Sequence, residues 1–174
     1  MMINKIYFGV ILAFITSCAT AADGGVYNLV GVGLSPVLGQ ESTWFGFGVS
    51  VGGGYNFNQY VGIETQISVM GIGTTSNVVV MPIPSLTLNG YIPVQEGVSL
   101  FGKIGKSETI IGYSGSDTQA HYSGQSNFYG VGVEILSTAN KNTYRFGVDY
   151  YDLGATPGAP LSAYYINLSS TTHF

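Results

Sequence analysis

Apolar and small or polar residues alternate along much of this chain with a period of two. The clearest case is residues 44–55, in which one face carries Phe45, Phe47, Val49 and Val51 and the other carries glycine or serine. The same alternation recurs in residues 60–70, 127–136 and 143–152. Successive side chains of a β-strand point to opposite faces of a sheet, so this period predicts strands rather than helices.

Eight segments of about ten residues follow one another after residue 22, each long enough to cross a bilayer as a tilted strand. They span residues 25–34, 44–55, 60–70, 81–92, 98–106, 127–136, 143–153 and 162–174. Short connections at 56–59, 93–97 and 137–142 alternate with longer ones at 35–43, 71–80, 107–126 and 154–161. Pro82 and Pro84 lack the N–H groups of a central strand, so we expect them to open the fourth strand at its rim.

The face opposite the bulky residues is crowded with glycine and polar side chains. Glycine accounts for 26 of the 174 residues, about twice the usual share of ~7%. Only 8% of the residues are charged, too few to cover an ordinary soluble domain with polar surface. Glycine fits the crowded interior of a small closed barrel, and bulk fits its lipid-facing exterior. The sequence therefore predicts an all-β fold, an eight-stranded antiparallel up-and-down transmembrane β-barrel.

Aromatic residues gather near both predicted rims of this barrel. One group comprises Tyr27, Tyr55, Phe57, Tyr60, Tyr91 and Tyr144. The other comprises Trp44, Phe45, Tyr150, Tyr151, Tyr164 and Tyr165. Those that point outward are expected to form girdles at the two membrane interfaces.

The first residues have the pattern of a secretory signal. Lys5 precedes an apolar stretch, and Ala19-Thr20-Ala21 is a small-residue cleavage motif, so we expect a signal peptide at 1–21 and a barrel domain at 22–174. An uncleaved membrane helix is the alternative, but the apolar stretch is short for a membrane span. Ile15-Thr16-Ser17-Cys18 is similar to a lipobox, so Cys18 is either lipidated or lost with the signal.

Several segments carry a family resemblance. They are Val30-Gly31-Val32-Gly33, Gly52-Gly53-Gly54-Tyr55, the run from Tyr129 to Glu134, and the C-terminal Phe174. With these segments the chain resembles the small outer-membrane β-barrel proteins of Gram-negative bacteria, namely the OmpA/OmpX-type and opacity-like porin-family barrels. The resemblance implies the outer membrane, two periplasmic termini, contact with membrane lipid and lipopolysaccharide, and insertion by the barrel-assembly machinery.

The resemblance also implies a C-terminal assembly signal. In this family a terminal aromatic residue follows alternating apolar residues, and the assembly machinery reads that pattern. The matching positions in this chain are Tyr164, Ile166, Leu168 and Phe174. Ser170 and Thr172 depart from the pattern, because apolar residues are expected there, so we expect less efficient insertion.

The phase of the strands places five charged residues in the lumen. They are Glu64, Lys103, Glu134, Arg145 and Asp149. If residue 136 pairs with 143 across the turn, Glu134 faces Arg145, and the two form a cross-strand ion pair. Buried charges need partners, so we interpret the set as a plug of salt bridges that closes the barrel. The alternative is a gate whose pairs exchange partners to admit ions, as proposed for some family members.

Candidate catalytic residues are few. His121-Tyr122-Ser123 with Glu134 resembles the motif of the outer-membrane lipid A deacylases, but Gly124 replaces the family's Asn and the preceding Arg is missing. Glu134 also lies too far along the same strand to meet Ser123. Two distant histidines and a single cysteine give no metal-site spacing and no disulfide framework. We therefore expect no catalysis, no cofactor and no metal.

The remaining candidate for function is the predicted loop 107–126. The chain has a net charge of −4 and no basic cluster, which excludes a nucleic-acid partner. In the resembling family such loops carry adhesion, serum resistance or phage reception, so the sequence predicts a structural and surface-interaction role through this loop. A narrow pore for ions or small solutes and, remotely, a lipid A deacylase are the alternatives. The outer part of this hairpin can instead continue as strand above the membrane and expose an edge to a host strand.

Overall fold

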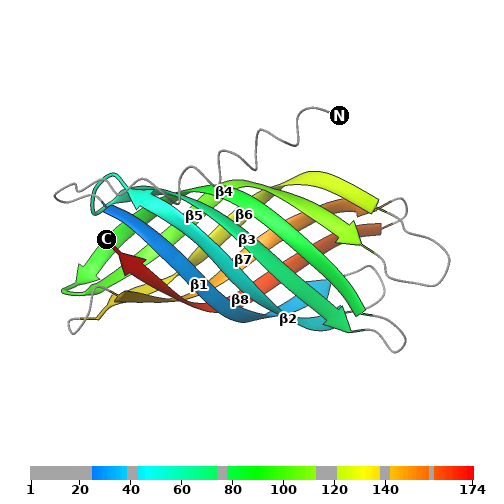
Figure 1. Cartoon of the computed structure of the whole chain (residues 1–174), viewed down its shortest axis with the longest axis horizontal. Helices are drawn as coiled ribbons and strands as arrows, with labels where there is room; N and C mark the ends of the chain where they lie inside the picture. Colours follow the sequence, from blue (N-terminus) through cyan, green and yellow to red (C-terminus); the bar gives the residue numbers. More distant parts are fainter. Residues whose placement is uncertain (1–24, 39–42, 74–77, 113–120, 138–141, 157–158) are drawn as a thin grey trace.

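The computed structural model describes residues 25–38, 43–73, 78–112, 121–137, 142–156 and 159–174. These residues form eight antiparallel strands that close into one barrel, in chain order (Figure 1). The strands are β1 (Gly25–Leu38), β2 (Thr43–Asn56), β3 (Val61–Gly73), β4 (Val78–Gln95), β5 (Val98–Gly112), β6 (His121–Leu136), β7 (Asn142–Thr156) and β8 (Ala159–His173). The predicted fold class and strand number are confirmed. The predicted signal peptide and Cys18 lie outside the described residues.

The barrel has two distinct ends. The termini end holds the first residue of β1, the last residue of β8 and the connections after β2, β4 and β6. The loop end holds the other four connections. No helix in the described part of the chain is long and apolar enough to cross a membrane.

The strands extend further toward the loop end than the sequence predicts. The connections there shrink to 39–42, 74–77, 113–120 and 157–158, so the predicted contrast between short turns and long loops is wrong except at 113–120. Alternation of apolar and polar residues fades beyond the membrane-facing part of each strand, and the backbone ladder continues without it. His121 accordingly begins β6 instead of lying in a loop.

Two prolines lie inside β4, whereas we expected them to open it. The strand begins at Val78, and Pro82 and Pro84 pair with β3 through Val69 and Ile67. On the other side, β4 and β5 pair at Val80 and again from Ser85 onward, with no pairs between. A proline has no N–H to donate to a ladder, which explains an interruption beside these two residues.

The hairpin formed by β5 and β6 continues beyond the last pair that β6 makes with β7. The two strands stay paired up to Gly112 and His121. Pairing between β6 and β7 stops at Phe128 and Tyr151, so within the described part of the chain residues 121–127 of β6 have no partner strand on the β7 side. Strand structure therefore continues into the predicted loop 107–126, as the alternative interpretation of this segment required.

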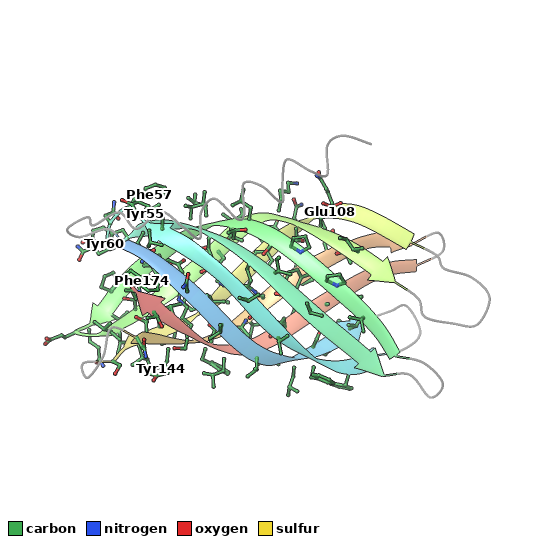
Figure 2. The ribbon with its side chains drawn as sticks, in the orientation of Figure 1. Tyr55, Phe57, Tyr60, Glu108, Tyr144 and Phe174 are labelled. Atoms are coloured by element: carbon green, nitrogen blue, oxygen red, sulfur yellow. The ribbon has the colours of Figure 1, made fainter. Side chains whose placement is uncertain are left out.

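The outer face of the barrel is apolar over most of its height. Large apolar side chains from all eight strands are exposed there, among them Val32, Phe47, Val131 and Phe146. Figure 2 shows aromatic side chains around the termini end: Tyr55, Phe57, Tyr60, Tyr144 and Phe174.

A second outward aromatic row crosses β6, β7 and β8 nearer the loop end. Neighbouring ring centroids of Tyr129, Tyr150 and Tyr164 lie 6.4 Å and 5.3 Å apart. Both rows fit the interfacial girdles of a membrane barrel. Beyond the second row, Lys106 and Glu108 are exposed on β5, so charges do occur at the margin of the outward band.

Only some of the tyrosines near the two rims belong to the girdles. Tyr27, Tyr91, Tyr151 and Tyr165 point into the lumen and are buried. Each of them occupies an inward-facing position of its own strand. Nearness to a rim therefore does not decide whether a tyrosine ring lies on the outer face.

The lumen consists of two layers, and this corrects the expected interior of glycine and polar groups. The half toward the termini end is polar and charged. The half toward the loop end is an apolar cluster of Val37, Met70, Met81, Ile83, Phe128, Tyr151, Ala163 and Tyr165. The rings of Phe128 and Tyr151 pack edge to face, with centroids 4.8 Å apart. Every member of this cluster is buried, with at most 3% of its surface exposed.

Gly105 of β5 lies where the neighbouring strand approaches most closely. A Cβ atom added there would overlap the backbone of Leu86 and would lie 2.8 Å from Cα of Thr87. Gly90, on the outward face of β4, would meet nothing within 4 Å. The two glycines therefore provide a matched pair for testing the packing of the wall.

We expect Gly105→Ala to destabilise the folded barrel by about 1–3 kcal/mol, because the strand backbones must move apart. Gly90→Ala should leave stability within about 0.5 kcal/mol. Urea unfolding of the refolded protein, read as the mobility difference between unheated and boiled samples on SDS gels, measures both. Equal midpoints for the two variants would contradict this packing.

Candidate functional site

The polar half of the lumen is organised around one carboxylate, Glu64 of β3. Its side chain is buried, and each of its oxygens accepts hydrogen bonds from other strands. Lys103 Nζ donates to Oε1 at 3.0 Å, and Arg145 Nη1 donates to Oε2 at 2.6 Å. The hydroxyl of Tyr27 donates to Oε2 at 2.8 Å. Charged hydrogen bonds of this kind are stronger than neutral ones, so Glu64 ties β1, β5 and β7 to β3.

Arg145 of β7 links this carboxylate to a second one. Only 1% of the Arg145 side chain is exposed, yet it uses three nitrogen atoms. Besides the Glu64 contact, Nε donates to Glu134 Oε2 at 2.6 Å and Nη2 donates to the hydroxyl of Tyr91 at 3.0 Å. Glu134 and Arg145 are cross-strand partners, as the turn register predicted. A planar guanidinium suits this bridging role, since its donors are fixed in a fork.

Asp149 forms the third acidic member of the network. Its Oδ2 accepts a hydrogen bond from Asn167 at 2.9 Å, and its Oδ1 lies 4.0 Å from Lys103 Nζ. Gly130 faces it across the β6–β7 ladder, and a Cβ at that position would overlap the carboxylate. The absence of a side chain at Gly130 therefore makes room for Asp149.

Sequence reasoning missed the neutral members of this network. Tyr27, Asn89, Tyr91 and Asn167 contact its charged groups, and Phe101 lies beneath both cations. The guanidinium carbon of Arg145 lies 4.9 Å from the ring centroid of Tyr27, a cation–π distance. The alternation of inward and outward positions could have identified them, because these residues share the inward face of their strands with the predicted charged residues.

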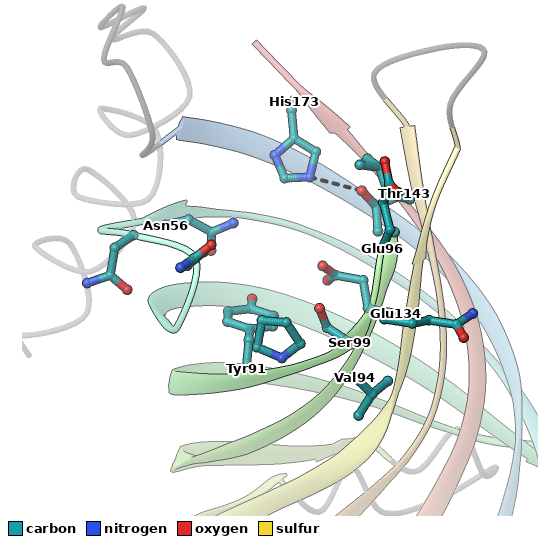
Figure 3. A pocket seen from close by; sticks show the side chains of 14 residues that line it. Asn56, Tyr91, Val94, Glu96, Ser99, Glu134, Thr143 and His173 are labelled. Atoms are coloured by element: carbon teal, nitrogen blue, oxygen red, sulfur yellow. Dashed lines mark hydrogen bonds between the residues drawn. The ribbon is translucent and has the colours of Figure 1, made fainter.

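A vestibule opens below the network at the termini end. Its volume is about 580 Å³, and Glu134, Ser99, Tyr91 and Thr143 are among the residues that line it (Figure 3). Across the mouth, His173 Nε2 lies 3.3 Å from the hydroxyl of Thr143. His173 thus faces inward at this rim.

The C-terminal residues of the predicted assembly signal lie on the outer face. The structure leaves Tyr164, Ile166, Leu168 and Phe174 exposed. They share one face of the chain's last strand and its end, while Asn167 and Ser169 point inward between them. The geometry required of an alternating outward signal is therefore present.

No catalytic arrangement forms from the candidate motif. His121 and Glu134 both belong to β6, which runs as one strand from the loop end to the termini end. Glu134 is engaged by Arg145, and no triad with residues 121–123 is possible at that separation. The described residues also contain no group of three or more His, Cys, Asp or Glu side chains close enough to hold a metal ion.

Removing Arg145 should destabilise the barrel more than any substitution on its outer face. We expect Arg145→Met to lower the free energy of unfolding by about 3–5 kcal/mol, because Glu64 and Glu134 keep their charges and lose their shared partner. Arg145→Lys should fall between wild type and Arg145→Met, since an ammonium group cannot bridge both carboxylates and Tyr91. Lys106→Met, which removes an exposed cation, is the matched control. Urea midpoints that coincide for wild type and Arg145→Met would rule out a paired network.

Solved structures share this architecture. Neisserial surface protein A matches with a TM-score of 0.78 and 12% identity over 88% of this chain and 100% of that chain. The attachment invasion locus protein Ail of Yersinia pestis matches with a TM-score of 0.59 and 18% identity over 88% of this chain and 100% of that chain. The N-terminal β-barrel domain of Pseudomonas aeruginosa OprF matches with a TM-score of 0.55 and 16% identity over 86% and 98%. At these identities the matches establish the fold.

A comparison with curated proteins finds no match. The family model "Outer membrane protein beta-barrel domain" matches residues 7–174, nearly the whole chain. The closed barrel, the outward apolar face with its aromatic rows and the inward ion network agree with that match. This chain belongs to the outer membrane protein β-barrel domain family.

Proposed function

We propose that this protein is a closed, non-catalytic outer-membrane barrel that presents its loop end as an interaction surface. The loop end faces the cell exterior, and both termini lie in the periplasm. The longest interval between strands, residues 113–120, is at the loop end, and a longer external connection is the usual polarity of such barrels. The outer face contacts membrane lipid and lipopolysaccharide, and the barrel-assembly machinery reads the exposed C-terminal residues.

The two layers of the lumen support a closed barrel rather than a narrow pore. An ion that passes the charged layer meets the apolar layer of Val37, Met70, Ile83, Phe128 and its neighbours, where no charged group replaces its hydration. Exchange of partners within the ion network leaves that second layer in place. We therefore favour a plug over a gate.

Purified, refolded protein in planar lipid bilayers should show no stepwise current at 100 mV-scale potentials, because the apolar layer excludes hydrated ions. Recordings with a general trimeric porin under the same conditions serve as the positive control. Stepwise openings of uniform size would show that the lumen conducts and would reverse this preference.

The observation that carries the interaction role is the free edge of β6. Residues 121–127 are paired to β5 but have no partner on the β7 side among the residues that the structure describes. Unpaired strand edges accept an added strand from another chain through main-chain hydrogen bonds. Extended segments of host or surface proteins are therefore the partners we propose for this hairpin.

The charge of the loop end limits which kind of partner it can bind. Ail of Yersinia pestis has been solved in complex with the heparin analogue sucrose octasulfate, a polyanion. In the present chain Lys103 and Arg145 are buried, and only Lys106 remains as an exposed cation among the described residues near the loop end. A polyanion needs a cluster of basic groups, so the proposed partner is a peptide segment and not a sulfated glycan.

Placing a charge on the free edge should reduce binding. We expect Gln125→Lys to lower adhesion of cells displaying the barrel to a host-cell monolayer several-fold, because edge lysines block strand addition. Ser162→Lys is the matched control, since Ser162 lies near the loop end in a strand paired on both sides. Surface levels are compared by whole-cell immunodetection. Adhesion that depends on the protein but is equal in both variants would place the partner site elsewhere.

A further inference from the structure

The vestibule at the termini end has the dimensions of a ligand site that the surface-interaction role does not use. Its volume of about 580 Å³ falls within the range of small-molecule pockets, about 300–1,000 Å³. Its inner end reaches Glu134 and Tyr91, both of which accept hydrogen bonds from Arg145 of the ion network. The loop end has no part in it, so a ligand would enter only from the side of the termini.

The charge of the vestibule is entirely negative. Glu134 lies at its inner end and Glu96 at its rim, and its lining contains neither lysine nor arginine. A cleft lined by one sign of charge and backed by low-dielectric walls concentrates counter-ions. This field selects cations.

The ion network behind the vestibule adds to this potential. Three carboxyl groups, those of Glu64, Glu134 and Asp149, face two cationic groups, those of Lys103 and Arg145. With all five ionised, the lumen has one uncompensated negative charge in a buried setting, which is unfavourable. Glu134 is the carboxylate at which a bound cation can compensate this charge, because its side chain is 18% exposed while the side chains of Glu64 and Asp149 are 1% exposed.

Side chains with oxygen acceptors line the same space. Arg145 occupies only Oε2 of Glu134, and Oε1 accepts no hydrogen bond from the described residues. The side chains of Asn56 and Gln95 add carboxamide groups to its lining. Ser99 is the cross-strand neighbour of Glu134 and supplies a further oxygen at the inner end.

We propose that this vestibule binds a linear organic diammonium cation, with one ammonium group at Glu134 and the other at Glu96. An ammonium group carries three donors and no acceptor, which complements a site that offers carboxylate, carboxamide and hydroxyl oxygens. A chelated metal ion fits less well. Calcium takes six to eight oxygen ligands, and the described residues contain no cluster of three acidic or histidine side chains.

The test titrates folded protein in detergent micelles with 1,4-diaminobutane at low ionic strength and follows backbone amide signals by NMR. Saturable shifts should centre on Glu134, Ser99 and Thr143 and should shrink when salt screens the charges. The diol 1,4-butanediol, which has the same length and no charge, should give none.

Three variants locate the site. Glu134→Gln should weaken binding about tenfold, as expected for the loss of one charged acceptor. Glu96→Gln should weaken it less, and it keeps the proposal testable if Glu134→Gln fails to fold, because Glu96 lies outside the ion network. Glu108→Gln, an exposed residue at the other end of the barrel, should match wild type.

Three results would overturn the proposal. One is that Glu96→Gln binds with the same affinity as wild type, while Glu134→Gln either also binds unchanged or fails to fold. Another is equal shifts with the diol, which would show that charge is not recognised. The third is saturation of the same amides by Mg²⁺ at the same midpoint, which would show a metal site.

Discussion

Pairing between β1 and β8 is the contact on which the rest of this structure depends. It joins residues from Tyr27 to Leu38 with residues from His173 to Ser162 and leaves no open edge across the apolar band. In hydrocarbon an unpaired N–H or C=O group costs several kcal/mol, so a sheet of eight strands is viable there only when closed. Closure also fixes the cross-section of the lumen. Every inward side chain then competes for one limited space, which is why glycines face bulky or charged partners such as Asp149.

Within that space the charged half holds the wall together from inside. Through its hydrogen bonds Glu64 connects β3 with β1, β4, β5 and β7, whose ladders alone join only nearest neighbours. Such buried ion networks do not guarantee more stability than a well-packed apolar core of equal volume. Their distinctive effect is to fix the strand register. A shift of one residue in β7 would turn the Arg145 side chain away from its two carboxylate partners and toward the lipid. We therefore regard the network as a device that fixes one arrangement of the eight strands.

The sequence was sufficient to predict the parts of the structure that depend on the alternation of inward and outward side chains. Period-two alternation located eight strands, and a single turn register brought Glu134 opposite Arg145. Phase alone was insufficient where both faces of a strand are bulky. Ile83, Tyr151 and Tyr165 lie inward beside outward apolar neighbours, so the apolar layer of the lumen left no alternation to detect. Contacts between strands that are not neighbours, such as Glu64 with Arg145, depend on strand tilt and stagger, which no local pattern encodes.

The order of the two layers determines from which side the network can be reached. Because the apolar layer lies toward the loop end, water and ions from that side are kept from Glu64 and Lys103, while Glu134 borders the vestibule at the opposite end. The same division separates the two kinds of recognition that we propose. At the loop end the proposed binding groups are backbone donors and acceptors along the β6 edge, which do not depend on charge. At the termini end they are the carboxylates of the vestibule, which would select a ligand by its charge. A substitution in the apolar layer would remove this separation without touching either surface.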